Sequence, residues 1–275
     1  MIKPTKIGIL DSGVGGLSVL LEIIKVIQNV DIHYIGDSSW CPYGNKSPEE
    51  IQKRVTSLAK YLISHDVEII VIACNSATIH AVQSVREKFD IPFVGMEPAV
   101  KPAAAATETG TIGILATQAS IAGEKFHHLL NTHAPPSKIK VITQPCPKFV
   151  ELVEAGTLNG ELIDQVIQEY TAPMLEANAD TLVLGCTHYP FLRTNIQNVV
   201  GNHIKLIDTG AAVANRTLSL IDQYQVNQTE RPLNETNIHI QTTGELEILK
   251  QIFPHLCPSL KDLAKLSQLS ELTLS

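Results

Sequence analysis

The chain has 275 residues and a formal net charge of −7, and no segment of it concentrates lysine and arginine. Binding to nucleic acid or to an anionic membrane surface uses clustered positive charge, so this balance argues against both as main partners. Hydrophobic residues make up 44% of the chain, yet no apolar run approaches the roughly 18 residues that a membrane-spanning helix needs. The length and balance predict one large globular domain or two smaller ones.

The first six residues are not followed by the apolar segment of a signal peptide. Five cysteines occur, at positions 41, 74, 146, 186 and 257. An odd number of cysteines without an export signal argues against a disulfide framework. We therefore expect reduced thiols and a cytoplasmic location.

Short runs rich in Val, Ile and Leu alternate with helical patterns along the chain. Many of these runs are continuous, which is typical of strands that are covered on both faces. In chain order the predicted strands are 6–10, 32–36, 69–73, 92–95, 111–116, 139–143, 181–185, 205–208 and 237–241. Strands that alternate with helices predict a parallel, doubly wound α/β architecture.

Two segments carry clear helix signals. Ser47-Pro48-Glu49-Glu50 is a capping box with proline at the first helical position, and apolar residues recur with helical spacing over 51–62. Near the C-terminus, leucines recur at 260, 263, 266, 269 and 272. This spacing predicts a terminal helix over 260–275, which we expect to pack on the core rather than on a second subunit.

Three segments of the first half recur in the second half at offsets of 105 to 112 residues. They are Ile7-Gly8-Ile9-Leu10 with Ile112-Gly113-Ile114-Leu115, Ala73-Cys74-Asn75 with Gly185-Cys186-Thr187, and 94–97 with 205–208. Ordered matches at a nearly constant offset indicate an internal duplication. We expect two doubly wound parallel-sheet domains related by a pseudo-twofold axis, with the active site in the cleft between them. The predicted domains are 1–96 plus 209–275, and 97–208.

Cys74 and Cys186 each follow an apolar strand and precede small polar residues, as the duplication requires. Ligands bind at the carboxyl ends of strands in open α/β sheets, and backbone N–H groups there favour a thiolate. Two thiols in facing domains can remove a proton from one face of a carbon and return one to the other. That geometry inverts a stereocentre. A single cysteine of this kind is more often a buried structural residue.

The segment Asp11-Ser12-Gly13-Val14-Gly15-Gly16 follows the first predicted strand. Its glycines let backbone N–H groups approach an anion at a helix N-terminus. It is neither a dinucleotide fingerprint, because Ser18 stands where the third glycine belongs, nor a phosphate-binding loop. A glycine-rich turn without a ligand remains an alternative, and Asp11 is placed to support a neighbouring acid or base.

Other polar residues lie near predicted strand ends. Asp37 and Pro42-Tyr43-Gly44 are expected in a surface loop of the kind often used in binding. His188 lies two residues after Cys186 and can help to set the protonation of its thiol, although an isolated histidine is more often structural. Glu154 is expected to begin a helix and, by pattern alone, to be solvated.

Two other chemistries fit these residues less well. Zinc held by Cys74, Cys186 and His188 lacks the C-x-x-C spacing of common structural sites. A cysteine hydrolase built on Cys186 and His188 leaves Cys74 unexplained, and two residues so close after a strand need not face each other.

Taken together, these segments resemble the glutamate racemases of the aspartate/glutamate racemase superfamily. The resemblance is carried by 11–16, 42–44, 73–76, Glu97-Pro98 and 185–190, and it extends from about residue 6 to about residue 255. It implies two α/β domains around a small polar cleft. It also implies proton transfer without pyridoxal phosphate or metal, a homodimer, and a role in supplying D-glutamate for peptidoglycan.

The resemblance also implies residue roles at matching positions. Cys74 and Cys186 would be the two bases, assisted by Asp11 and His188 respectively, with Glu154 as a further acid. The implied substrate contacts are Asp11, Ser12, Tyr43, Gly44, Asn75, Ser76, Thr187 and His188. Ser76 stands where the family usually has threonine, and the segment 38–41 departs from the family pattern. Aspartate as the substrate, and an inactive amino-acid-binding relative, stay open as alternatives.

Overall fold

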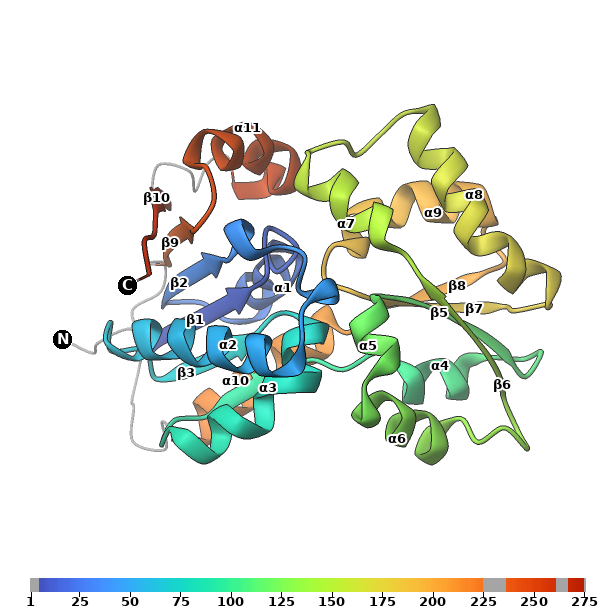
Figure 1. The fold of residues 1–275 in the computed structure, drawn as a ribbon, viewed down its shortest axis with the longest axis horizontal. Coiled ribbons are helices and arrows are strands. Elements are labelled where there is room, and N and C mark those ends of the chain that lie inside the picture. Colours follow the sequence, from blue (N-terminus) through green and yellow to red (C-terminus); the bar gives the residue numbers. More distant parts are fainter. Residues whose placement is uncertain (1–4, 225–235, 261–266, 275) are drawn as a thin grey trace.

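The computed structural model of the chain describes residues 5–224, 236–260 and 267–274. Their strands form two parallel sheets, one in each lobe of the molecule (Figure 1). The first sheet has the order β10-β9-β2-β1-β3-β4, and the second has the order β6-β5-β7-β8. The strands are β1 (Thr5–Asp11), β2 (Val30–Gly36), β3 (Ile69–Ile72), β4 (Phe93–Gly95), β5 (Thr111–Ala116), β6 (Lys140–Pro145), β7 (Thr181–Gly185), β8 (Lys205–Ile207), β9 (Asn237–Thr242) and β10 (Ser267–Glu271).

The predicted duplication is visible in the strand order. β2-β1-β3-β4 in the first sheet corresponds to β6-β5-β7-β8 in the second, and every one of these pairs is parallel. The repeated tetrapeptide lies in β1 and in β5, so it occupies the same place in both sheets. Cys74 and Cys186 follow β3 and β7, which are also equivalent. All nine predicted strands are therefore confirmed, with ends that differ by at most two residues.

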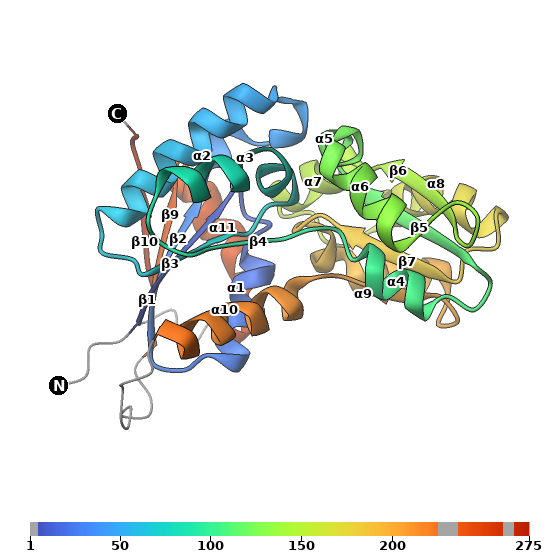
Figure 2. The same cartoon turned by 90° about the horizontal axis from the view of Figure 1, so that it is seen from below.

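Helices cover both faces of each sheet, as continuous apolar strands require (Figure 2). The α-helices are α1 (Leu17–Val26), α2 (Pro48–Ile63), α3 (Asn75–Lys88), α4 (Val100–Ala106), α5 (Gln118–Ala122), α6 (Glu124–His133), α7 (Pro147–Glu154), α8 (Glu161–Glu176), α9 (Arg193–Val200), α10 (Gly210–Tyr224) and α11 (Leu246–Leu256). Short 3-10 turns are η1 (Ser38–Trp40), η2 (Tyr43–Asn45), η3 (Tyr189–Leu192) and η4 (Pro258–Leu260).

Strand β1 shows how its side chains divide between two layers. Ile7 and Ile9 point to the core that contains α1 and α10, whereas Leu10 points to the core that contains α2 and α3. The first of these cores continues into α7, α8 and α9 of the second lobe. This shared apolar layer holds the two lobes together on one side.

The capping-box prediction for α2 is confirmed. Ser47 accepts a hydrogen bond from Glu50 N, and Glu50 accepts one from Ser47 N. Ile51, Val55 and Leu62 are fully buried on the inner face. Each such side chain contributes about 1.5–3 kcal/mol when it leaves water, so packing rather than propensity fixes this helix.

The terminal-helix prediction is wrong. Ser267–Glu271 forms β10, which pairs in parallel with β9 at the edge of the first sheet. Leu269 contacts one core and Leu272 is buried in the other, so these leucines lie on opposite faces, as in a strand. The edge of β9 offers unpaired N–H and C=O groups to this segment. The hydrogen bonds formed there stabilise a strand more than the leucine spacing stabilises a helix. Residues 261–266 of the predicted helix lie outside the described residues.

The chain returns to the first lobe after β8, since α10 packs against α1 and β9 pairs with β2. We propose domain boundaries on this basis, with 1–96 plus 209–275 as one domain and 97–208 as the other. Among the described helices, none has the length and apolar character needed to cross a bilayer.

Three histidines lie close together beside strands β2 and β9 of the first sheet. The ring of His33 on β2 lies 5.0 Å from the ring of His239 on β9 and 5.8 Å from that of His65. Partial burial, then the charges of His239, His65 and Lys6, lower the pKa of His33, and Asp31 opposes them. The folded state therefore resists protonation of His33 more than the unfolded state does.

This cluster makes stability depend on pH. As pH falls below the ordinary histidine value of about 6.5, the unfolded chain binds the proton first, so the free energy of unfolding decreases. Between pH 7.5 and pH 5.5 we expect the urea unfolding midpoint of the unchanged protein to fall relative to that of His33→Gln, since His188, whose raised pKa acts in the opposite sense, is present in both proteins. His80, whose pKa burial also lowers, is present in both proteins, so their difference isolates His33. Equal losses in both proteins would contradict the assignment.

Candidate active site

The carboxyl ends of β1, β3, β5 and β7 carry the polar residues of the site. Cys74 follows β3 as the N-cap of α3, and its Sγ accepts a hydrogen bond from Ala77 N at 3.4 Å. The Cys74 thiol donates to Ser12 Oγ at 3.7 Å. Burial, then the charge of Asp11, raises the pKa of Cys74 far above the usual range, although the Ala77 N–H and Ser12 oppose this. Cys74 is therefore a neutral thiol at pH 7.

Cys186 has a different environment. It is buried after β7, and its Sγ lies 3.6 Å from His188 Nδ1. Burial alone lowers the pKa of His188, but hydrogen bonds to Cys186, Cys41 and Glu154 raise it well above the ordinary histidine value. The imidazole is therefore protonated at neutral pH and can exchange a proton with Cys186. The contact also removes one objection to a cysteine hydrolase, because Cys186 and His188 do approach each other.

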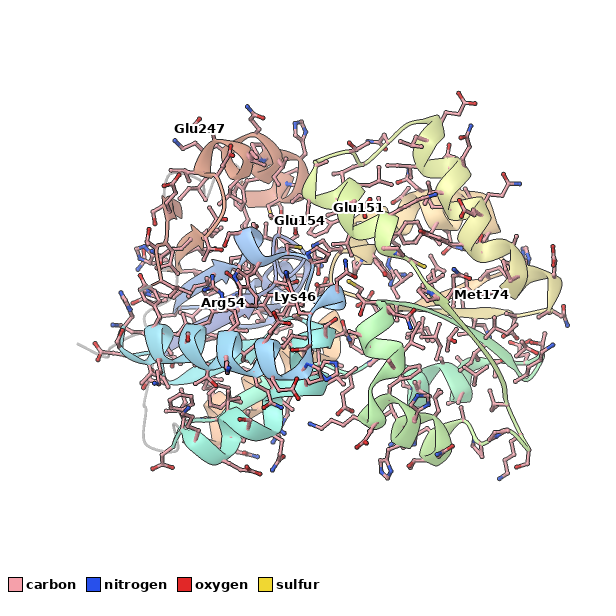
Figure 3. All side chains as sticks on the ribbon, viewed as in Figure 1. Lys46, Arg54, Glu151, Glu154, Met174 and Glu247 are labelled. Carbon is pink, nitrogen blue, oxygen red and sulfur yellow. The ribbon has the colours of Figure 1, made fainter. Side chains whose placement is uncertain are left out.

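Glu154 connects the two lobes. Its Oε1 lies 2.6 Å from His188 Nε2 and accepts a hydrogen bond from Val14 N at 2.8 Å. Glu154 is the last residue of α7, so the prediction that it begins a helix is wrong. It is also not a freely solvated side chain, because it faces the first lobe (Figure 3). The contact spans 140 residues of sequence, which no local pattern could indicate.

The glycine-rich loop binds carboxyl groups of the protein itself. Asp11 is fully buried, and its Oδ2 accepts hydrogen bonds from Gly13 N at 3.1 Å and Gly16 N at 2.9 Å. Burial raises the pKa of Asp11, against the effect of His188 and of these N–H groups. Thr187 Oγ1 donates to Asp11 Oδ1 at 3.4 Å. The loop amides at 13, 14 and 16 thus position Asp11 and Glu154 rather than hold an external anion.

Gly13 makes the approach of Glu154 possible. A Cβ at this position would lie 1.9 Å from Glu154 Oε1. We therefore expect Gly13→Ala to push the carboxyl group away from His188 and Val14 without unfolding the chain, because a flexible side chain can move aside. Loss of a charge-assisted hydrogen bond is worth about 1.5–3 kcal/mol, or roughly 10- to 150-fold in kcat/KM.

The effect of Gly13→Ala can be separated from general damage by a double-mutant cycle with Glu154→Gln. If both changes act through one contact, the double variant loses little more than either single variant. Fully additive losses would show that Gly13 acts by another route. Gly123→Ala is the matched control, because the added methyl group crowds the side chain of Ile79 and not that of Glu154.

Asn75 is the clearest sign of a ligand. Its side chain is 2% exposed, and neither its Oδ1 nor its Nδ2 has a hydrogen-bond partner among the described residues. An unsatisfied buried amide costs about 1–3 kcal/mol. Because Asn75 directly follows Cys74, this donor and acceptor are placed to meet a polar molecule at the thiol.

Ser76 contacts residues that the sequence did not single out. Its Oγ lies 2.9 Å from Thr117 Oγ1 and 3.5 Å from Ser120 Oγ, at the start of α5 in the second lobe. The duplication could have indicated Thr117, since at an offset of 105 residues it is the equivalent of Ser12 in the second half of the chain. Both hydroxyls follow the equivalent strands β5 and β1.

The loop after β2 reaches the surface at Ser39 and Asn45, but two of the side chains that we expected there point inward. Asp37 and Tyr43 are buried, and the Tyr43 hydroxyl donates to Asp37 Oδ2 at 2.7 Å. Arg54 of α2 binds the same carboxyl group through two N–H groups, and Thr243 Oγ1 donates to it at 2.7 Å. Tyr43 thereby fixes the loop, while Gly44 lies against Thr117 of the second lobe.

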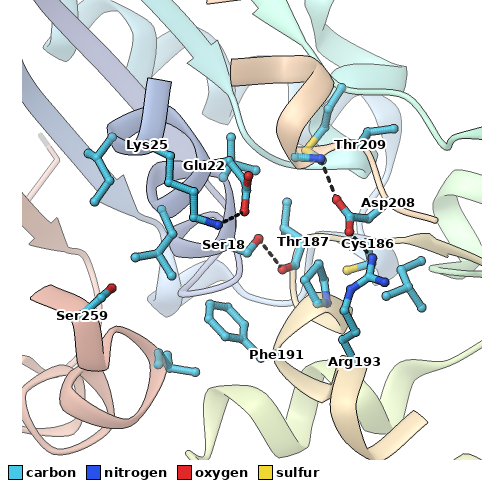
Figure 4. Close-up of a pocket in the computed structure, with 18 of the residues that line it drawn as sticks. Ser18, Glu22, Lys25, Cys186, Thr187, Phe191, Arg193, Asp208, Thr209 and Ser259 are labelled. Carbon is cyan, nitrogen blue, oxygen red and sulfur yellow. Dashed lines mark hydrogen bonds and ion pairs between the residues drawn. The ribbon is translucent and has the colours of Figure 1, made fainter. Parts of the chain in front are cut away.

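A cavity of about 580 Å³ borders the Cys186 loop. It lies between α1, η3, α9 and η4 and is lined mainly by apolar side chains, with the ion pair of Arg193 and Asp208 at its wall (Figure 4). Ser18 Oγ donates to Thr187 O at 2.8 Å. This bond ties α1 to the loop of the second lobe beside Cys186.

Comparison with known proteins agrees with this geometry. The family model of Asp/Glu/Hydantoin racemase matches residues 7–217. Glutamate racemase of Herpetosiphon aurantiacus is 49% identical over 80% of this chain and 86% of its own, and that of Ectopseudomonas mendocina is 43% identical over 91% and 94%. The structure of Escherichia coli glutamate racemase, solved with L-glutamate and the activator UDP-MurNAc-ala, superimposes with a TM-score of 0.84 at 29% identity over 99% of both chains. These matches show that the chain is an amino-acid racemase and that it belongs to the Asp/Glu/Hydantoin racemase family.

Proposed function

We propose that this chain interconverts L- and D-glutamate by proton transfer between Cys74 and Cys186. The observation that carries the proposal is the pair of buried thiols at equivalent strand ends of two duplicated sheets. The curated names of relatives that cover most of the chain support glutamate over aspartate as the substrate. The two thiols supply both the proton acceptor and the proton donor, so the proposal requires neither pyridoxal phosphate nor metal.

The two thiols have different hydrogen-bond partners before substrate binds, and this difference matches the two roles that the reaction requires. Cys74 is a neutral thiol between Ser12 and Ala77, whereas Cys186 can exchange a proton with the protonated His188. A 1,1-proton transfer needs one thiolate to remove the α-proton and one thiol to deliver a proton to the opposite face. Such acid–base help contributes typically about 10² to 10⁴-fold.

Stabilisation of the carbanionic transition state must supply the remaining acceleration. We propose that the amide of Asn75 binds a polar group of the substrate, since it is buried and unsatisfied among the described residues. The hydroxyls of Ser12, Ser76 and Thr187 lie on the same loops. Asp11 assists proton transfer at Cys74, and His188 assists it at Cys186. Tyr43 and Gly44 contribute by holding their loop in place beside the site.

The cellular role follows from the proposed product. We propose that the chain supplies D-glutamate for peptidoglycan in the cytoplasm, as a homodimer. All five cysteines are free, which suits a reducing compartment. Sedimentation of the purified protein tests the homodimer.

The test follows circular dichroism of L-glutamate and of D-glutamate with purified protein in the presence of EDTA, with L-aspartate as a competing substrate. We expect the signal of either glutamate enantiomer to decay to zero, since both directions use the same two thiols. Decay with aspartate alone would show that aspartate is the substrate and would leave the proposed proton-transfer mechanism unchanged. A stable signal with every amino acid would overturn the proposed function.

A further inference from the structure

A third cysteine meets the catalytic loops from the first lobe. Cys41 lies between η1 and η2, and its Sγ, a carboxyl oxygen of Glu154 and a ring nitrogen of His188 all lie within 4.8 Å of one another. In the part of the chain that the structure describes, this is the one group of three or more cysteine, histidine and acidic residues placed so closely. Cys41 itself transfers no proton in the proposed scheme, where it is only a hydrogen-bond partner of His188.

The three donors suit a borderline divalent cation. Thiolate sulfur, imidazole nitrogen and carboxylate oxygen bind Zn²⁺ at about 2.0–2.3 Å, so ligand atoms in a tetrahedral site lie roughly 3.5 Å apart. The observed cluster needs only small side-chain movements to reach this spacing. Hard cations such as Mg²⁺ prefer six oxygen ligands, which this set does not offer. Three protein ligands leave the fourth position to water.

The surroundings also favour an ion here. Glu154 is held by Val14 N and the His188 ring is buried beside Cys186, so two of the three ligands are already oriented. A thiolate from Cys41 and a carboxylate from Glu154 offset the two positive charges of the ion. Binding releases the Cys41 thiol proton and the proton between His188 and Glu154 to solvent.

We propose that Cys41, Glu154 and His188 form an inhibitory binding site for Zn²⁺ or a similar borderline divalent cation. The ion joins the loop after β2 to the second lobe, and it occupies the imidazole that otherwise exchanges a proton with Cys186. The inhibitory effect rests on the proposed racemase function, whereas binding of the ion does not.

The test titrates ZnCl₂ into tag-free, EDTA-treated and dialysed protein by calorimetry. We expect one ion per chain, and at least about 10²-fold weaker binding in Cys41→Ser, because removing a ligand costs more than the 10- to 100-fold seen for groups behind the ligands. Cys257→Ala removes a buried thiol outside the cluster and should bind zinc as the unchanged protein does. Co²⁺ should give a thiolate-to-metal absorption band that is lost only in Cys41→Ser.

The racemase assay then tests inhibition. Each rate is compared with that of the same protein without zinc. Zn²⁺ should inhibit the unchanged protein and Cys257→Ala, whereas Cys41→Ser should need at least tenfold more zinc to lose half of its own zinc-free rate; Mg²⁺ should have no effect. Zinc binding through Cys41 in a chain without racemase activity would support the site and reject the proposed function. Equal zinc affinity in Cys41→Ser and the unchanged protein, or none in either, would overturn the site.

Discussion

Replacement of either Cys74 or Cys186 by alanine should reduce racemisation in both directions by at least about 10²-fold, the lower range of acid–base contributions. The reason is symmetry. Whichever thiol removes the α-proton from one enantiomer, the other must deliver the proton that completes the inversion. An enzyme with a single catalytic cysteine would lose activity only when that one cysteine is changed.

Proton exchange in deuterated water separates the two half-reactions. Each single variant keeps one thiol, which can remove the α-proton of one enantiomer and return deuterium to the same face without inversion. We therefore expect one variant to exchange L-glutamate alone and the other to exchange D-glutamate alone, as measured by NMR. The two variants should have opposite preferences.

Cys257→Ala provides the control for the loss of a buried thiol, since Cys257 is fully buried in the core. It should racemise at close to the unchanged rate at temperatures where it is folded. Exchange of both enantiomers by Cys74→Ala would contradict the two-thiol mechanism, because one thiol would then reach both faces.

The sequence predicted the sheets well because buried parallel strands are encoded locally. Each needs only a short continuous apolar run, as in Thr181–Gly185, whose five residues are all buried. Strand β10 was missed because its pairing depends on the free edge of β9, about 30 residues earlier in the chain. A leucine spacing compatible with a helix could not reveal that edge.

The candidate site was predictable in part for the same reason. Strand ends and the internal duplication place Cys74 and Cys186, whereas the position of Glu154 depends on a contact to Val14 in the other lobe. The carboxyl group of Asp37 binds Tyr43 of its own loop, Arg54 of α2 and Thr243, which is 206 residues further along the chain. Such partners follow from tertiary packing and have no signature in local spacing.

Asn75→Leu should stabilise the protein while it weakens the reaction. Both polar atoms of Asn75 are buried without a partner among the described residues, and an unsatisfied amide costs about 1–3 kcal/mol. Leucine has a similar shape and no polar atom, so we expect a higher midpoint of thermal unfolding. The same change removes a hydrogen bond to a charged substrate, worth about 1.5–3 kcal/mol or roughly 10- to 150-fold in kcat/KM.

Thr78→Val, one turn further along α3, is the matched control. The Thr78 hydroxyl donates to Ile72 O and accepts from Met96 N, so both of its hydrogen bonds are made within the protein. Its loss should lower the unfolding midpoint and leave catalysis much less affected. Glutamate should raise the midpoint of the unchanged protein and of Thr78→Val by preferential binding to the folded state, and should raise that of Asn75→Leu far less. If Asn75→Leu is destabilised and still gains stability from glutamate, the amide is a structural residue. A gain in stability coupled to a loss of glutamate binding would instead mean that this buried amide is kept, at a cost in folding, for the substrate.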